Sequence, residues 1–255
     1  MALAIARHLQ IKGLLNIQYV IYKDEIYVLE VNPRSSRTVP FLSKATGVPI
    51  VELATKVILG ETLSAMGINN GLWPVGDKVA VKVPVFSFSK LRQVEPSLGP
   101  EMKSTGEVMG IDCQYQKALY KAFLAVGMQM SVQGALLASL ADRDKEEGIK
   151  LVQRFYKLGF RIIATEGTAR QLRQAGIQVT TVAKPHNSTE IMDKIRRGKV
   201  QCVLNTTTYG WKIASNGFLL RRAAIEQGIP CFTNLDTAEA WLQALEVNAP
   251  SLIMP

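Results

Sequence analysis

The sequence is poor in cysteine and has no long apolar run, and both shortages exclude classes of protein. Only three cysteines occur in 255 residues, and no two of them have the CxxC spacing of a zinc site. They also form no disulfide framework, so the expected compartment is a reducing cytoplasm. No apolar stretch approaches the roughly 20 residues that a membrane span needs. Residues 1–13 carry basic side chains within their apolar pattern, which a secretory signal peptide does not.

Acidic residues are fewer than basic ones, and this imbalance indicates an anionic partner. Thirty Lys and Arg against 21 Asp and Glu give a formal net charge of +9. The basic residues are scattered apart from short clusters such as 194–199, and no nucleic-acid recognition motif accompanies them. We therefore expect a phosphorylated small molecule as the partner, and neither nucleic acid nor a membrane. The hydrophobic content of 47% excludes a disordered, collagen-like or coiled-coil chain.

The pattern of residues 1–130 predicts an incomplete α+β lobe. Two β-rich runs flank the polar break Lys23-Asp24-Glu25, which predicts a three-residue hairpin loop that pairs Tyr22 with Ile26. Only two strands are well marked, and their apolar faces need cover from other structure. Residues 61–110 are rich in Gly and Pro and predict mostly irregular structure. The predicted elements are an N-terminal helix, strands at 14–22 and 26–31, a loop after the second strand, a helix at 50–59, a strand-like run at 78–88 and a helix at 112–126.

The pattern changes near residue 131, and residues 131–255 predict a second unit. Short apolar runs alternate with amphipathic helical stretches five times. Such alternation predicts right-handed crossovers and a doubly wound five-stranded parallel sheet, in an α/β fold with helices on both faces. The predicted strands are 135–140, 160–164, 179–182, 200–205 and 230–234, and the helices are 142–158, 168–175, 188–197, 214–227 and 237–245.

A first group of candidate site residues lies on the predicted hairpin. Counting back from the loop places Gln18 opposite Glu30, and strand alternation puts Asn32 on the same face as Glu30. A carboxylate with amide oxygens suits Mg²⁺ or Mn²⁺ that holds nucleotide phosphates, and Arg34 lies just beyond. The same residues are also compatible with an ordinary Asn-Pro turn and an exposed glutamate.

A second group lies where the strands of the predicted parallel sheet end. Carboxyl ends of parallel strands meet at one edge, so hydroxyls, an amide and lysines converge there, which suits a phosphate. Lys145 would lie in the first turn of its helix, where its positive charge is unfavourable beside the positive end of the helix dipole. A bound anion would offset this repulsion. A solvated lysine and helix-capping threonines are the alternatives. The group comprises Lys145, Thr165, Thr168, Lys184, Asn205 and Thr207.

Two stretches carry a resemblance to a known family. EVNPRSSRTVPFLSKATG, residues 30–47, resembles the metal-binding end of an ATP-grasp domain, and more narrowly the second ATP-grasp half of the carbamoyl-phosphate synthase large subunit. Residues 99–110 are similar to that family as well. ATEGTA, residues 164–169, resembles the methylglyoxal-synthase-like regulatory domain that ends the same subunit. The resemblance covers essentially the whole chain, with a domain boundary at 130/131.

The resemblance implies roles for both groups of residues. Gln18, Glu30 and Asn32 would bind Mg²⁺ or Mn²⁺, and Arg34 would act catalytically on the phosphates of ATP, the substrate. The six residues of the second group would hold the phosphate of an allosteric nucleotide such as UMP or IMP. The intact enzyme makes carbamoyl phosphate from bicarbonate, glutamine and two ATP. Its partners would be a glutaminase small subunit and the remainder of the large subunit.

One departure from the family bears on the activity of the chain. The family's glycine-rich phosphate loop lies upstream of the metal hairpin, and nothing at the N-terminus here replaces it. We therefore expect no synthase activity from these residues alone. The alternatives are a stand-alone nucleotide-binding or phosphate-binding regulatory module and a true methylglyoxal synthase. The latter needs a carboxylate base at the sheet edge, where strand 200–205 ends in Asn-Thr-Thr instead. A purine-synthesis cyclohydrolase domain also has a Gly-Thr-Ala turn, but its Lys-Thr-Leu-His stretch is absent from residues 184–198.

Overall fold

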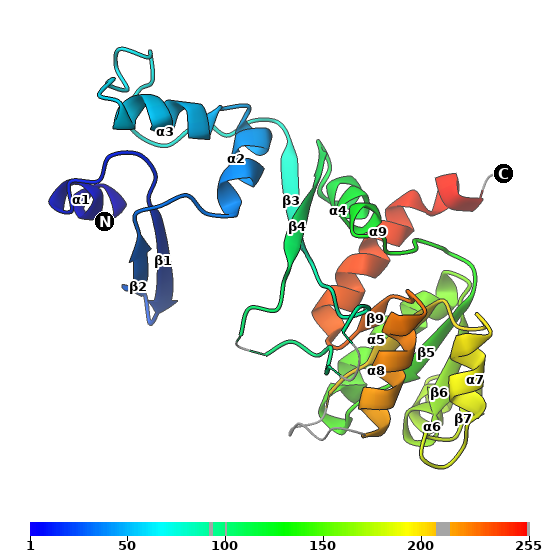
Figure 1. Cartoon of the computed structure of the whole chain (residues 1–255). Coiled ribbons are helices and arrows are strands. Elements are labelled where there is room, and N and C mark those ends of the chain that lie inside the picture. The colour runs from blue at the N-terminus through cyan, green and yellow to red at the C-terminus, as the bar shows by residue number, and fades with distance from the viewer. Residues whose placement is uncertain (92–93, 100, 208–214, 254–255) are drawn as a thin grey trace. The chain divides into compact units, whose positions relative to one another are not determined.

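The computed structural model describes residues 1–91, 94–99, 101–207 and 215–253 (Figure 1). For residues 249–253 it describes the backbone alone. The chain divides into two compact units, Met1–Lys78 and Val79–Pro255. The domain boundary predicted at 130/131 stays a prediction. Within the described part of the chain, none of the helices is long and apolar enough to cross a membrane.

The first unit contains one antiparallel hairpin and three helices. Its elements are α1 (Ala2–His8), β1 (Asn16–Tyr22), β2 (Glu25–Asn32), α2 (Thr38–Thr46) and α3 (Ile50–Ile58). Helix α2 falls in a stretch for which the sequence predicted a loop. Pro40 is tolerated there because it lies in the first turn, where the backbone N–H has no intrahelical partner. Gly47, at φ 73°, ends the helix in the left-handed conformation.

The second unit begins with an antiparallel pair that the sequence predicted only in part. Strand β3 (Val79–Val85) was predicted, but it pairs with β4 (Gly106–Asp112), which lies where irregular structure was expected. Helix α4 (Tyr115–Ala125) packs against both strands. Gly110 allows this close approach, because a Cβ there would lie 1.9 Å from the carbonyl oxygen of Ala118.

The five-stranded parallel sheet of the second unit is confirmed. The elements from its first strand onward are β5 (Ala135–Ser139), η1 (Asp142–Asp144), α5 (Lys145–Lys157), β6 (Arg161–Thr165), α6 (Glu166–Gln174), β7 (Val179–Val182), α7 (Glu190–Arg196), β8 (Cys202–Asn205), α8 (Asn216–Glu226), β9 (Cys231–Phe232) and α9 (Leu235–Ile253). Its spatial order is β7-β6-β5-β8-β9, so the direction of winding reverses between β5 and β8. Helices α4, α5, α6 and α9 contribute to the core on one face, and α7 and α8 to the core on the other.

Candidate functional site

The hairpin has a different turn from the predicted one but the same register at the candidate residues. Its loop has two residues, Lys23 and Asp24, with φ of 49° and 64°, the backbone that suits a tight hairpin turn. Tyr22 therefore pairs with Glu25, and the predicted pairing of Tyr22 with Ile26 is wrong. An irregularity in the ladder between Gln18 and Tyr19 then shifts the register by one residue.

This shift restores the predicted arrangement of the candidate metal ligands. Gln18 lies opposite Glu30, and Asn16 lies opposite Asn32. Glu30 and Asn32 share a face because their positions differ by two. Gln18 and Glu30 are exposed, and Asn32 is half-buried. Arg34 follows the strand, where its guanidinium donates to the carbonyl oxygen of Ser35 at 2.9 Å.

The donor set of the hairpin is compatible with a hard cation but is weakly charged. It offers one carboxylate and several amide oxygens, the ligand atoms that Mg²⁺ and Mn²⁺ prefer. Among the described residues, no group of three or more His, Cys, Asp or Glu side chains is placed to hold a metal. Most of the compensating negative charge would therefore have to come from nucleotide phosphates, as is usual for Mg²⁺.

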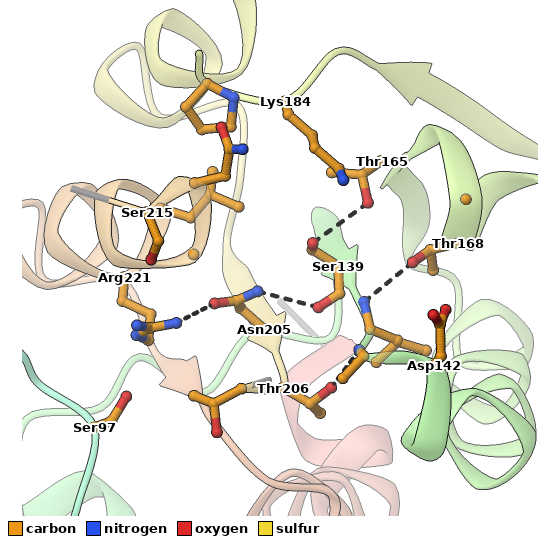
Figure 2. A pocket seen from close by; sticks show the side chains of 18 of the residues that line it. Ser97, Ser139, Asp142, Thr165, Thr168, Lys184, Asn205, Thr206, Ser215 and Arg221 are labelled. Atoms are coloured by element: carbon orange, nitrogen blue, oxygen red, sulfur yellow. Dashed lines mark hydrogen bonds between the residues drawn. The ribbon is translucent and has the colours of Figure 1, made fainter. Parts of the chain in front are cut away.

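The second group of residues converges on one pocket. The pocket has a volume of about 580 Å³ and lies where β5, β6 and β8 end, at the point where the strand order reverses. In open parallel sheets this is the usual place for a ligand. Figure 2 shows polar side chains from these strands and from α8 facing the same space. All six predicted residues line it: Lys145, Thr165, Thr168, Lys184, Asn205 and Thr207.

One side of the pocket is built from the turn between β6 and α6. Thr165 occupies the N-cap position of α6 but makes no capping hydrogen bond, and its hydroxyl donates to Ser139 Oγ at 3.3 Å. Thr168 Oγ1 accepts the Leu140 N–H at 3.1 Å, which leaves its own proton available to a ligand. The N–H groups of the first helical turn therefore have no side-chain cap and can bind an anion. Glu166 in this turn is exposed and does not line the pocket.

Two lysines add positive charge on this side. Lys145 is the first residue of α5, as predicted, and its ammonium group pairs with the Asp142 carboxylate. This hydrogen bond holds the pKa of Asp142 below its ordinary value. Lys184 follows β7, is exposed and lines the same pocket. Figure 2 shows its side chain extending toward Thr165.

The other side of the pocket is a chain of buried hydrogen bonds centred on Asn205. The amide Nδ2 of Asn205 donates to the Ser139 carbonyl oxygen at 3.1 Å, and its Oδ1 accepts from Arg221 Nη1 at 2.6 Å. Arg221 comes from α8 and is 5% exposed. Gly217 makes this contact possible, because a Cβ there would lie 2.7 Å from Arg221 Nη1. Thr207 lines the pocket, and its carbonyl oxygen accepts from Arg143 Nη2 at 2.7 Å.

Arg221 in turn holds a carboxylate that the sequence did not predict to be near the pocket. Its Nε and Nη2 donate to Glu95 Oε1 and Oε2 at 2.8 and 2.6 Å. The backbone N–H and the hydroxyl of Ser97 also donate to Glu95 Oε1. Burial opposes ionisation of Glu95, but these hydrogen bonds outweigh it and lower the pKa of the carboxyl group. Glu95 and Ser97 lie between β3 and β4, outside the five-stranded sheet.

Three of the pocket's residues thus escaped prediction for identifiable reasons. Glu95 and Ser97 belong to a segment without periodicity, so no pattern could place them in space. Arg221 lies on a helix that alternation predicted correctly. The sequence did offer one signal for it, because Arg221 directly follows the apolar residues 218–220 and could therefore be buried with them. A buried arginine needs an anionic partner, which would have indicated a carboxylate nearby.

Two protein-family models match the sequence. The model described as "Carbamoyl-phosphate synthase L chain, ATP binding domain" matches residues 1–66, which include the whole hairpin. The model described as "MGS-like domain" matches residues 147–233, which include most of the pocket but not Glu95. Among solved structures, a methylglyoxal synthase from Elizabethkingia anophelis NUHP1 is 16% identical. The match covers 44% of this chain and 79% of that chain, with a TM-score of 0.39.

Proposed function

We propose a function for this chain from the two domains that it carries. An ATP-binding domain is followed by an MGS-like domain, as in the C-terminal portion of the carbamoyl-phosphate synthase large subunit. The proposed role of the chain is to be that portion of a glutamine-dependent synthase. In the intact enzyme it would take part in the ATP-dependent phosphorylation of carbamate. The MGS-like domain would bind the phosphate of a regulatory nucleotide.

The proposed chemistry in the first unit is phosphoryl transfer. A carbamate oxygen attacks the γ-phosphorus of ATP, the bond from that phosphorus to the bridging oxygen breaks, and ADP leaves. Gln18, Glu30 and Asn32 would hold Mg²⁺ or Mn²⁺, which neutralises charge on the phosphate oxygens when bound. Arg34 would donate hydrogen bonds to the transferring phosphoryl group. The alignment of Gln18 with Glu30 on the hairpin supports these roles.

We expect the 255 residues to have no synthase activity by themselves. The hairpin exposes side chains on both faces, and two of the three candidate ligands, Gln18 and Glu30, are exposed. A phosphoryl-transfer site must exclude water and fix its nucleotide. The missing surfaces would come from the remainder of the large subunit, and a glutaminase subunit would supply ammonia.

The observation that carries the regulatory proposal is the convergence at the sheet edge. Two lysines, two threonine hydroxyls and the uncapped first turn of α6 face one pocket. The ammonium groups, the Thr168 hydroxyl and the N–H groups of that turn can donate hydrogen bonds to a ligand, and together they match the oxygens of a phosphate. A nucleotide such as UMP or IMP is therefore the proposed effector.

Methylglyoxal synthase activity is the weaker alternative. Among the described residues that line the pocket, the two carboxylates are Glu95 and Asp142. Both are paired with cations, and both have a pKa below the ordinary value. A general base is most effective with a pKa nearer the working pH, so neither carboxylate suits proton abstraction.

Calorimetric titration of the full chain with UMP and IMP tests the regulatory proposal. We expect saturable binding that Lys184→Ala abolishes or weakens by about tenfold or more, the value of one charge-assisted contact. Lys150→Ala is the matched control, because Lys150 is an exposed lysine outside the pocket. Failure of a folded chain to bind either nucleotide would contradict the proposal. Formation of methylglyoxal from dihydroxyacetone phosphate would favour the alternative.

A further inference from the structure

The pocket contains more positive charge than it offers to a ligand. Its basic side chains are Arg143, Lys145, Lys184 and Arg221. Three of them have a carboxylate partner within 3.4 Å. Among the described residues, Lys184 makes no ion pair. The charge that a ligand meets therefore depends on how firmly each carboxylate is held.

The ion pair between Lys145 and Asp142 is easily exchanged for a ligand. The Asp142 side chain is 95% exposed, whereas that of Lys145 is 15% exposed and faces the pocket. An ion pair with one partner in water contributes little stability. A phosphate can therefore take the ammonium group while Asp142 returns to solvent. Lys145 and Lys184 are then both available to one phosphoryl group.

The ion pair between Arg221 and Glu95 is held much more firmly. The side chains are 6% and 16% exposed, and two parallel hydrogen bonds join them. Ser97 adds two more hydrogen bonds to the carboxylate, and Asn205 accepts the third from the guanidinium. Separating a buried, bidentate pair leaves an uncompensated charge and is costly. Arg221 is therefore closed to a ligand.

Arg221 nevertheless lines the same pocket as the two lysines, so a ligand that binds at the lysines can extend toward it. Hydrogen bonds connect it through Asn205 and Ser139 to Thr165, with donor–acceptor distances of 2.6, 3.1 and 3.3 Å. Figure 2 shows this chain crossing the pocket from Arg221 to Thr165, beside which Lys184 lies. Glu95 lines the pocket beside Arg221, so a second phosphoryl group that extended toward Arg221 would approach a carboxylate.

We propose that Glu95 is a specificity-determining residue that restricts the pocket to ligands with one phosphoryl group. By occupying Arg221 it withholds the cation that a diphosphate would need and places a carboxylate there instead. Discrimination by an unfavourable charge is a general route to specificity. The part of the ligand that lies near Arg221 and Glu95 is then uncharged, as the nucleoside of a nucleoside monophosphate is. This inference rests on the proposed function, because it assumes that the lysine side binds phosphate.

The test compares UMP with UDP on the full chain, by calorimetry without divalent cations so that the diphosphate charge is not masked. The wild-type chain binds UMP more tightly than UDP. Glu95→Gln releases Arg221 as a cation and shifts the ratio of the two dissociation constants toward UDP by about tenfold or more, equivalent to about 1.4 kcal/mol. The double variant Glu95→Gln with Arg221→Gln removes that cation and returns the ratio toward the wild-type value.

Glu226→Gln is the matched control for loss of a carboxylate beside a buried arginine. Glu226 pairs with Arg222 at 2.7 Å, and the Arg222 side chain is 7% exposed, yet neither residue lines this pocket. The control leaves the UMP/UDP ratio unchanged.

An equal change in both affinities on Glu95→Gln would overturn the inference and leave nucleotide binding intact. Tighter binding of UDP than of UMP to the wild-type chain would overturn it without any variant. Absence of binding by both nucleotides would instead overturn the proposed function together with this inference.

Discussion

The hairpin of the first unit and the pocket of the second present their polar groups in opposite ways. On the hairpin, apolar and polar side chains are exposed alike, with Ile21 at 73% and Leu29 at 61% exposure. In the pocket, Thr165, Thr168 and Asn205 are each under 5% exposed and are held by hydrogen bonds. The described residues of the pocket are therefore held in place within one unit, whereas Gln18 and Glu30 on the hairpin are exposed.

The difference follows from how each element is supported. A two-stranded hairpin without a covered face is marginal by itself, and only Val39 and Ala54 are buried hydrophobics in the described first unit. The strands beneath the pocket lie between two hydrophobic cores, so their ends are fixed. Substitutions in the pocket should therefore change folding stability, while substitutions on the hairpin should not.

The largest effect is expected from Arg221→Ala. The substitution leaves the largely buried Glu95 carboxylate without its cation and removes a hydrogen bond from Asn205. Breaking a buried pair in this way typically costs about 3–5 kcal/mol of the free energy of unfolding. Urea unfolding of the second unit measures the loss. Arg170→Ala, at an exposed position of α6, is the control and should stay within about 0.5 kcal/mol. Equal stabilities for the two variants would show that the Arg221 pair adds nothing to the fold.

A smaller loss is expected from Thr168→Val. Its hydroxyl is the acceptor for the buried Leu140 N–H, and valine has nearly the same shape without an acceptor. An unsatisfied buried donor costs about 1–3 kcal/mol. The matched control is Thr180→Val, an exposed threonine on β7. Chemical denaturation compares both variants with the wild type. A loss no larger than that of the control would mean that the Leu140 N–H finds another partner.

How much of the pocket the sequence could predict depends on where its residues come from. Alternation of apolar runs predicted the parallel sheet, and the rule for carboxyl ends placed Lys145, Thr165 and Lys184 together. Glu95 reaches the pocket from a segment with no periodicity, and its position depends on packing that local sequence does not encode. Arg221 was within a predicted helix, but which face the helix buries is decided by the sheet.

On the hairpin, two errors of detail cancelled. The predicted loop was one residue too long, because the turn accepts positive φ at both Lys23 and Asp24. The irregularity beside Gln18 compensated for the difference, so Gln18 still lies opposite Glu30. The alternation of side chains along a strand predicts which face each residue occupies. The same alternation does not reveal the ladder irregularity between Gln18 and Tyr19. The role of these residues in metal binding stays a prediction.

The acid dependence of stability separates the charge of Glu95 from its packing. Its folded-state pKa lies below the ordinary value of 4.5, so its ion pair stabilises the fold above that value. The stabilisation is lost as the pH falls through the folded-state pKa. We expect the stability difference between wild type and Glu95→Gln to be largest near pH 7 and to shrink below about pH 4. Denaturant unfolding at several pH values measures it, and a constant difference would show that packing, not charge, is responsible.

The smallest effect is expected from Glu30→Gln on the hairpin. Glu30 is exposed, and its strand is held by backbone pairing that glutamine preserves. The free energy of unfolding should change by no more than about 0.5 kcal/mol. Circular dichroism during chemical denaturation, with Arg221→Ala measured in parallel, checks this value. A loss comparable to that of Arg221→Ala would mean that the hairpin is fixed by contacts of its own side chains. The contrast between an open set of ligands and a built pocket would then no longer hold.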